Sequence, residues 1–202
     1  IAKSHGTKYC GFFIMTISAY VLGNGTSRQQ VNLEKLRSYG KIYGCNALYR
    51  DFAPDVLIAT DPGISKEIQD SGYALKNTFY TRKPLHNSGA KRIEYNFGYS
   101  SGPIALSYAS NSGADTIYLL GFDFAGLGGK FNNVYADTVH YKRSDDNETY
   151  YGNWVDQVQN IVKNNPNRQY IRVINNNIVP PVLAQLKNLS HQQLELFLEN
   201  HK

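Results

Sequence analysis

Four groups of polar residues that could bind a ligand follow apolar runs of the sequence. The first is the turn Gly23, Asn24, Gly25, Thr26 and Ser27, which comes directly after the apolar run ending at Leu22. Asn46, Asp61 and Asp123 each follow a later apolar run. Ligands of open parallel sheets bind outside the carboxyl ends of the strands. If these runs are strands of one sheet, the four groups converge on a single crevice.

The glycine turn leads into residues 29–39, whose apolar residues have helical spacing. A helix that begins after glycines exposes unpaired backbone N–H groups and the positive end of its dipole, which together favour an anion. The turn lacks the third glycine of the dinucleotide fingerprint, and no phosphate-binding lysine follows it. A tight turn without a ligand explains the same residues, so the turn alone does not identify its anion.

Short apolar runs alternate with segments of helical period along most of the chain. The expected strands are 17–22, 41–45, 56–60, 78–81, 92–96, a run within 116–124, and 170–175; the expected helices are 29–39, 65–71, 103–112 and 150–165. Short, continuously apolar strands that alternate with helices are typical of a mostly parallel sheet covered on both faces. The predicted class is therefore α/β, a Rossmann-like three-layer sandwich in a single domain.

Residues 15–178 are predicted to form this Rossmann-like domain. It includes a long loop at 121–151, where Gly, Asn and Asp interrupt the apolar periodicity, and loops of that length are commonly functional or mobile. Residues 179–202 are interpreted as a C-terminal helical tail, because Ser190 and Gln193 have capping-box spacing before an apolar helix. Residues 1–14 are interpreted either as an extension or as a genuine first segment, since Met15 is the only methionine.

The formal net charge of +5 favours an anionic partner such as a nucleotide, a sugar phosphate, nucleic acid or membrane lipid. No run of five basic residues occurs, and the densest basic region is 80–92, so nucleic acid is not the expected partner. Cys10 and Cys45 have neither metal-ligand spacing nor the pattern of a disulfide framework, which favours a cytoplasmic location. The apolar stretch 9–22 is too short to span a bilayer, so no transmembrane segment is expected.

Three stretches, LGNGTSR (22–28), YGCNALYRDFAPDVLIATDP (43–62) and SSGPIALSYASNSGADTIYLLGFDFAGLGGKFNNVYADT (100–138), resemble two related protein groups in this order. One is the bacterial sialyltransferases with a single Rossmann-type domain, which have a G-N-G-P-S turn, a later C-N, a T-S-G and a G-I-D-F. The other is the domain shared by motility-accessory flagellin glycosyltransferases and archaeal 6-hydroxymethylpterin pyrophosphokinase, with G-x-G-P-S, D-P and G-x-D-L-A-x-x-G-G-K. The resemblance covers roughly residues 17–140, and Thr26 departs from the proline of both groups.

The resemblance implies a nucleotide-binding role for several residues. Asn24 and Asn46 would hydrogen-bond the phosphate or sugar of the nucleotide, and the N–H groups of residues 25–27 would face the phosphate. Ser101 and Gly102 would contact the ribose or base from another helix N-terminus. The remaining nucleotide contacts would be Asp61, Asp123 and Tyr135, the last against the departing phosphate.

His140 lies in the long loop, where the sialyltransferases have a histidine that acts as general base. A histidine with a pKa near neutrality can take the proton of an acceptor hydroxyl. The resemblance therefore implies a glycosyltransferase-like enzyme. It would transfer a sugar from a nucleotide-activated donor, such as a CMP-linked acidic sugar, to a hydroxyl acceptor on a glycan or small molecule. Such a mechanism requires no cofactor and no metal. The sequence also allows the protein to form an oligomer.

Two alternatives remain open from the sequence. One is pyrophosphoryl transfer from ATP to a small heterocyclic alcohol, which would need Mg²⁺ and could use Asp61 and Asp123 as ligands. The other is a module that binds nucleotide or RNA without catalysis.

Overall fold

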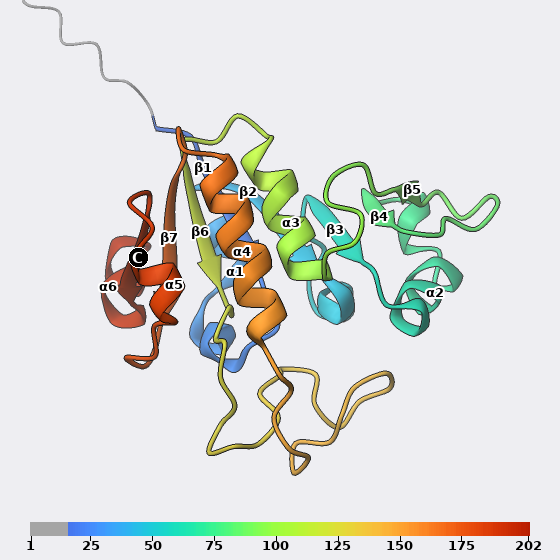
Figure 1. Cartoon of the computed structure of the whole chain (residues 1–202). Helices are drawn as coiled ribbons and strands as arrows, with labels where there is room; N and C mark the ends of the chain where they lie inside the picture. The colour runs from blue at the N-terminus through green and yellow to red at the C-terminus, as the bar shows by residue number, and fades with distance from the viewer. Residues whose placement is uncertain (1–15) are drawn as a thin grey trace, which may run out of the picture.

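The structure is a computed structural model that describes residues 16–202, so the extension expected at 1–14 lies outside the described residues. The strands are β1 (Ser18–Leu22), β2 (Gly40–Cys45), β3 (Val56–Ala59), β4 (Phe79–Thr81), β5 (Lys91–Arg92), β6 (Thr116–Leu120), β7 (Gln169–Ile174) and β8 (Leu189–Gln193). They form one sheet in the order β5-β4-β3-β2-β1-β6-β7-β8 (Figure 1), and every neighbouring pair is parallel. The predicted Rossmann-like α/β class is confirmed.

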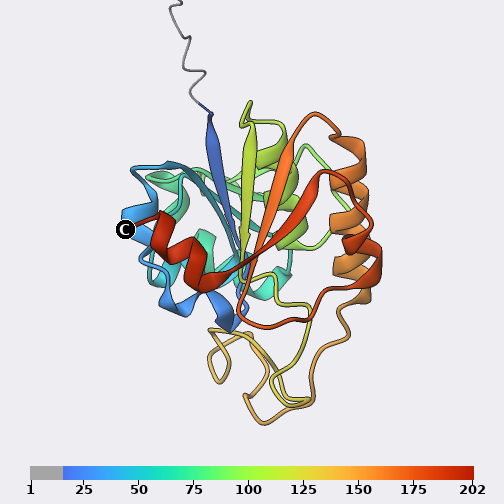
Figure 2. The same cartoon turned by 90° about the vertical axis from the view of Figure 1, so that its left-hand side faces the viewer.

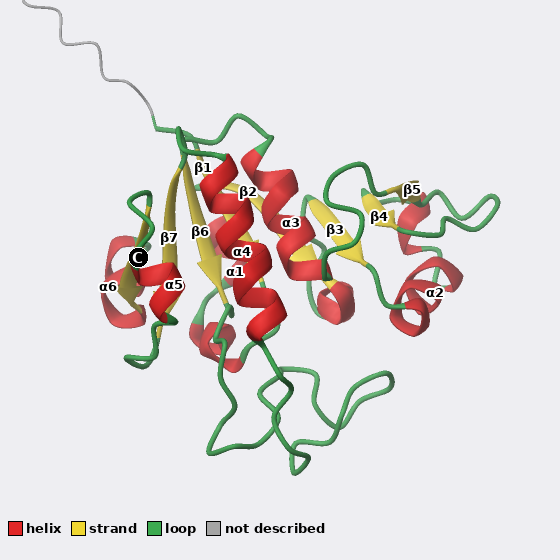
Figure 3. Ribbon diagram, in the orientation of Figure 1, coloured by secondary structure: helices red, strands yellow, loops and turns green. Residues whose placement is uncertain are grey.

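Helices cover both faces of this sheet, as Figures 2 and 3 show. The helices are α1 (Leu33–Leu36), α2 (Pro62–Asp70), α3 (Ser101–Ser110), α4 (Gly152–Asn164), α5 (Pro181–Ala184) and α6 (Leu194–Asn200), with short 3-10 helices at Thr26–Gln30, Asn46–Arg50 and Tyr73–Leu75. Side chains of α3, α4 and α5 belong to one buried cluster, and side chains of α1, α2 and α6 belong to the other. Within residues 16–202 no helix combines the length and the apolar character needed to cross a membrane.

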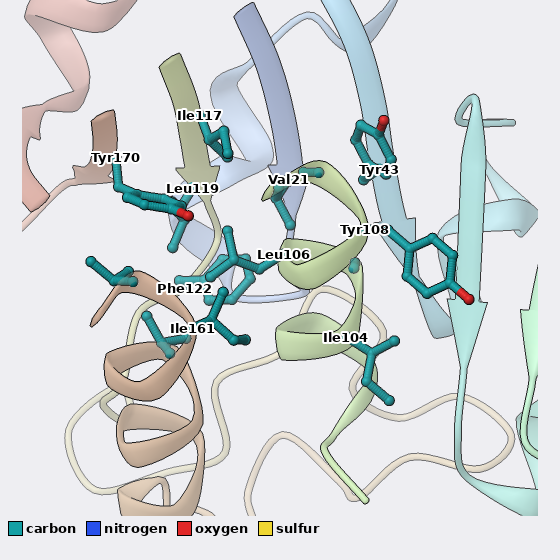
Figure 4. Packing of buried hydrophobic residues seen from close by; sticks show 14 of the residues in the cluster. Val21, Tyr43, Ile104, Leu106, Tyr108, Ile117, Leu119, Phe122, Ile161 and Tyr170 are labelled. Atoms are coloured by element: carbon teal, nitrogen blue, oxygen red, sulfur yellow. The ribbon is translucent and has the colours of Figure 1, made fainter. Parts of the chain in front are cut away.

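The inner strands are apolar on both faces because each face is covered, as in β1, β3 and β6. Successive side chains of a strand point to opposite faces. In β1, Ala19 and Val21 therefore pack under α3 and α4 (Figure 4 shows part of this cluster), whereas Tyr20 and Leu22 pack in the opposite cluster. This double burial accounts for the continuous apolar runs from which the parallel sheet was predicted.

Two elements are shorter than the sequence predicts. The helix expected at 29–39 is replaced by the 3-10 helix Thr26–Gln30 and by α1. Asn32 starts α1 afresh, because its side-chain oxygen accepts the N–H of Lys35 at 3.0 Å. The strand expected at 92–96 pairs only at Lys91–Arg92, so β5 is a minimal edge strand.

The C-terminal segment differs most from its prediction. Residues 179–202 contain α5 and α6, but between them β8 joins the sheet beside β7, so the segment is not simply a helical tail. The expected capping box is wrong: Ser190 lies in the β7–β8 ladder opposite Ile171, and α6 begins only after Gln193, without a side-chain cap. This placement buries Leu194 and Phe197 in the core.

Candidate functional site

The order of the strands reverses at β1, which lies between β2 on one side and β6 on the other. A cavity of about 230 Å³ lies at this point, at the carboxyl ends of the strands and the N-terminus of α3. Eight of the predicted nucleotide-binding residues line it: Gly23, Asn24, Gly25, Asn46, Asp61, Ser101, Gly102 and Asp123. The volume is slightly below the roughly 300–1,000 Å³ of typical ligand pockets, which suits a ligand that protrudes from the site.

The N–H groups of the glycine turn are already hydrogen-bonded within the protein. Gly25 donates to the carbonyl of Gly121 at 3.0 Å, Thr26 to Asn132 Oδ1 at 3.0 Å, and Ser27 to Asp123 Oδ2 at 3.2 Å. They are therefore not free for an external phosphate, which corrects the expectation from the resemblance.

Asp123 acts as the internal anion of this turn. Its side chain is only 9% exposed and accepts the N–H and the hydroxyl of Ser27 and the Nδ2 of Asn132. A Cβ on Gly25 would overlap the Asp123 carboxylate, so this position must be glycine for the carboxylate to reach the turn. The glycines that suggested a phosphate site are explained by the approach of the chain's own carboxylate.

Three predicted phosphate contacts do not line the cavity: Thr26, Ser27 and Tyr135. The Thr26 hydroxyl donates to Asn132 Oδ1 at 2.8 Å, so it ties the long loop to the turn. Tyr135 is 5% exposed, and its hydroxyl lies 3.3 Å from the Arg28 guanidinium, from which it accepts. Burial raises the pKa of Tyr135 to about 12, against the lowering effect of Arg28. Tyr135 therefore packs the loop against the fold.

His140 also lies outside the cavity lining. Its Nε2 is 3.3 Å from Glu67 Oε2, and its ring packs against Gly63 in the first turn of α2. Arg50 bonds the same carboxylate of Glu67 and the loop carbonyl of Val139, so this corner of the loop is held by ionic contacts. The structure gives His140 a partner in α2 and does not bring it to the residues expected to surround the reacting atoms.

The N-terminus of α3 is the part of the cavity that offers free donors. The N–H groups of Ser101 and Gly102 have no partner among the described residues, and α3 has no side-chain cap. The Ser101 hydroxyl is occupied instead, since it accepts the N–H of Thr60 at 3.0 Å and lies 2.9 Å from the Thr60 hydroxyl. Two free N–H groups and the helix dipole make this end of α3 favourable for one anionic group.

Asn24 and Asn46 differ in whether their side-chain amides are free to bind a ligand. Asn24 spans the cavity floor through contacts of 3.4 Å each, from its Nδ2 to the Cys45 carbonyl and from Arg28 to its Oδ1. Asn46 adopts a left-handed backbone conformation, with φ of 53°, and its buried side-chain oxygen has no hydrogen-bond partner in the described part of the chain. Because an unpaired buried acceptor is costly, this oxygen is suited to an N–H or O–H donor of a ligand.

Much of the remaining wall is aromatic and was not assigned to the site by the sequence. It consists of Phe122, Phe124, Phe131, Tyr151 and Trp154. Asn132, Asn133 and Glu148 join it from the long loop, where no periodicity marks individual positions. Aromatic rings beside amide groups are suited to a sugar or a nucleoside base, which present both apolar faces and polar edges.

The charge of the cavity is negative. Its lining contains Asp61, Asp123 and Glu148 and, among the described residues, no Lys, Arg or His. Glu148 accepts the N–H of Gly126 at 2.7 Å, and Asp123 accepts hydrogen bonds from Ser27 and Asn132. Asp61 is therefore the cavity carboxylate without a hydrogen-bond partner in residues 16–202. No group of three or more His, Cys, Asp or Glu side chains in that range could hold a metal ion.

A buried arginine supports the cavity from behind. Arg172 of β7 is 1% exposed and donates to the carbonyls of Phe122 at 2.6 Å, Asp123 at 2.8 Å and Ile178 at 2.9 Å. Burial lowers the pKa of Arg172 to about 10, although the nearby charge of Asp123 opposes the change. The guanidinium thus holds the end of β6 in place and compensates the charge of Asp123.

Comparison of the chain with protein-family models, with curated proteins and with solved structures finds no match.

Proposed function

We propose that the chain binds a nucleotide-activated sugar in the cavity and transfers the sugar to a hydroxyl acceptor, as a glycosyltransferase-like enzyme. One observation carries the proposal. Residues expected to bind the nucleotide come from five separate segments, at 23–25, 46, 61, 101–102 and 123, and they line one cavity at the switch point of the sheet. Nucleotide sites of doubly wound sheets lie at this position.

The phosphate of the donor binds at α3 in this proposal, and not at the glycine turn. The N–H groups of Ser101 and Gly102 are free, whereas those of residues 25–27 are bonded internally. The free side-chain oxygen of Asn46 accepts a donor group of the sugar or base. The aromatic wall, with Trp154 and Tyr151, contacts the apolar faces of the ligand.

The charge of the cavity selects among nucleotides. Three carboxylates line it, without a basic side chain from residues 16–202, so each further phosphate on a ligand adds repulsion. A CMP-linked sugar brings a single phosphodiester, whereas ATP brings a triphosphate that normally relies on bound cations. The same argument disfavours pyrophosphoryl transfer from ATP, because both oxygens of Asp123 are bonded internally and are not available to Mg²⁺.

Asp61 is the proposed general base, because it is the cavity carboxylate without a hydrogen-bond partner in residues 16–202 and no histidine of that range lines the cavity. The acceptor oxygen forms a bond to the anomeric carbon of the sugar while its proton passes to Asp61. The bond from that carbon to the phosphate oxygen breaks, and its electron pair leaves with the nucleotide. The free N–H groups at α3 stabilise the charge that develops on the departing phosphate.

A thermal-shift panel tests the binding step. CMP, a CMP-linked acidic sugar, UDP, ADP and ATP are compared with and without Mg²⁺. We expect the CMP ligands to raise the melting temperature without Mg²⁺, since binding to the native state stabilises it by an amount that grows with the logarithm of ligand concentration over the dissociation constant. Asn46→Gly should weaken this shift, and Asn87→Gly is the matched control, because Asn87 is also left-handed, with φ of 57°, but exposed and outside the cavity.

Absence of any nucleotide-dependent shift in the wild type would refute the proposal, and a shift only with ATP and Mg²⁺ would favour pyrophosphoryl transfer. The chemical step is tested separately with Asp61→Asn. This variant should keep the CMP shift and lose at least about a hundredfold of sugar transfer to an acceptor, which is within the usual contribution of a general base. Unchanged transfer by Asp61→Asn would exclude Asp61 as the base.

A further inference from the structure

Most of the excess positive charge of the chain lies on one edge of the sheet, away from the cavity lining. Residues 71–114 contain five Lys or Arg residues and a single acidic residue, Glu94. Four of the basic residues, Arg82, Lys83, Lys91 and Arg92, lie on β5 or between β4 and β5. Figure 1 shows this segment at the end of the sheet opposite α6. The densest basic region of the sequence is therefore a localised surface in the fold.

Three of these cations rest on aromatic rings. The guanidinium carbons of Arg82 and Arg92 lie 5.9 and 5.6 Å from the centre of the Phe97 ring, and Lys91 Nζ lies 5.7 Å from the centre of the Tyr80 ring. Phe97 is 45% exposed. Within residues 16–202 no basic side chain of this group is in ion-pair contact with a carboxylate. Cation–π contacts thus hold a set of positive groups that lack anionic partners.

Residues 97–100 connect this basic edge of the sheet to the cavity, and Arg82 holds them in place through two hydrogen bonds. Arg82 donates to the carbonyls of Phe97 at 3.0 Å and Tyr99 at 2.8 Å. The next residues, Ser100 and Ser101, line the cavity and begin α3. Three residues span at most about 11 Å, so Phe97 lies within that distance of the cavity lining.

We infer that Arg82, Lys83, Lys91, Arg92 and Phe97, which we term the cationic–aromatic surface, bind the anionic groups of an acidic oligosaccharide acceptor. The inference rests on the proposed function, because a transferase needs a site from which the acceptor hydroxyl reaches the cavity. The planar guanidinium of Arg92, which makes no hydrogen bond within residues 16–202, matches a carboxylate or sulfate group in a two-bond geometry, whereas Arg82 contributes its charge while its Nε and Nη2 hold the loop. An acceptor bound here by its anionic groups extends its terminal sugar toward Asp61.

Single-stranded RNA is the other polyanion that cations and aromatic rings could bind. Such binding depends on bases that stack on accessible ring faces. Two guanidinium groups already lie over Phe97, and Tyr95, the neighbouring exposed ring, packs edge-on against Tyr108. The rings therefore serve to position the cations, which favours recognition of discrete anionic groups.

Fluorescence anisotropy with labelled oligosaccharides tests the inference. The probes are an oligogalacturonate, which carries only carboxylates, a heparin-derived fragment, which also carries sulfates, a neutral malto-oligosaccharide and a single-stranded RNA of similar length. The test variant is Lys83→Glu/Lys91→Glu/Arg92→Glu, which spares Arg82 and its loop contacts. The control variant is Lys41→Glu/Lys163→Glu/Lys187→Glu, whose exposed residues lie elsewhere and change the net charge equally.

We expect the wild type to bind an acidic oligosaccharide and not the neutral one, with affinity that falls as salt rises. The test variant should lose at least about tenfold in affinity, because three positive charges that attract the anionic groups become negative, and the control should change less than threefold. A preference for oligogalacturonate or for the heparin fragment identifies the anionic group. Equal loss in both variants, tighter binding of RNA, or no binding of either acidic probe would overturn the inference.

The CMP thermal shift separates failure of this inference from failure of the proposed function. The test variant should retain the wild-type nucleotide shift, since none of its substituted residues lines the cavity. A protein that shows the CMP shift and binds no acidic oligosaccharide refutes only the cationic–aromatic surface. A protein that binds acidic oligosaccharides without any nucleotide shift refutes the transferase and leaves a polyanion-binding surface.

Discussion

Removal of the Asp123 carboxylate should destabilise the protein strongly and create an anion site that the native protein lacks. In Asp123→Ala, the N–H and hydroxyl of Ser27 and the Nδ2 of Asn132 lose their shared acceptor. Each buried donor left without a partner costs about 1–3 kcal/mol, and water that enters the vacated space recovers part of this. We therefore expect a loss of about 3–5 kcal/mol in the free energy of unfolding, a large share of the roughly 5–15 kcal/mol typical of a native domain.

Urea denaturation followed by circular dichroism measures this loss, and Asp61→Ala is the matched control. Asp61 is a carboxylate of the same cavity without a hydrogen-bond partner in residues 16–202, so its removal should cost less than about 1 kcal/mol. In a thermal melt, the Asp123 variant should unfold roughly 6–20 °C earlier than the wild type.

Sulfate provides the decisive second measurement. Asp123→Ala frees the N–H and hydroxyl of Ser27 and the Nδ2 of Asn132, which the native carboxylate occupies, so sulfate should raise the melting temperature of the variant more than that of the wild type. Equal destabilisation by Asp61→Ala, or equal stabilisation of both proteins by sulfate, would refute the conclusion that the turn binds an internal anion.

Three further predictions concern Cys45, Glu67 and Arg172. Burial raises the pKa of the Cys45 thiol to about 12, so in a Cys10→Ser background native protein should react with a thiol reagent at pH 8 far more slowly than unfolded protein, and reaction within mixing time would contradict this. Burial acts to raise the pKa of Glu67, but hydrogen bonds from Tyr49 and Arg50 outweigh it and lower the pKa below its ordinary 4.5. The ionised Glu67 should therefore stabilise the native state above pH 4.5, and this contribution should be lost as pH falls through the lowered pKa. The difference in unfolding free energy between wild type and Glu67→Gln should shrink over that pH range. A difference that does not change with pH would exclude a stabilising role of the Glu67 charge. Arg172→Met should cost about 3–5 kcal/mol in urea denaturation, because three backbone carbonyls lose their donor, whereas a cost below 1 kcal/mol would show that water replaces the guanidinium.

The sheet and the convergence of the strand ends could be predicted because both depend on local patterns. Doubly buried strands must be apolar throughout, and parallel strands place their carboxyl ends at one edge. These two rules bring Asn24, Asn46, Asp61 and Asp123 to one cavity from positions up to 99 residues apart. The prediction was reliable where the backbone alone determines position.

The partner of each polar group could not be predicted in the same way. Glycines and free N–H groups suit a ligand phosphate and an internal carboxylate equally, and only the contact between Ser27 and Asp123, 96 residues apart, distinguishes the two. His140 is paired with Glu67 because the loop crosses the start of α2, which no spacing in the sequence reveals. The strand β8 was missed because Leu189–Gln193 is a polar edge strand, buried mainly at Leu189.

A contact between β1 and the C-terminal helix α6 determines when the central strand can complete its packing during synthesis. Tyr20 of the central strand β1 shares a hydrogen bond of 2.9 Å with His201, and its ring packs against Phe197, which is fully buried. While the ribosome is still translating the residues between them, Tyr20 lacks its contacts with α6, and β1 lacks its neighbour β6 until Leu120 has been added. During the synthesis of residues 20–201, the central strand should therefore lack part of its native covering until α6 has formed, and an apolar strand exposed in this way favours transient chaperone binding.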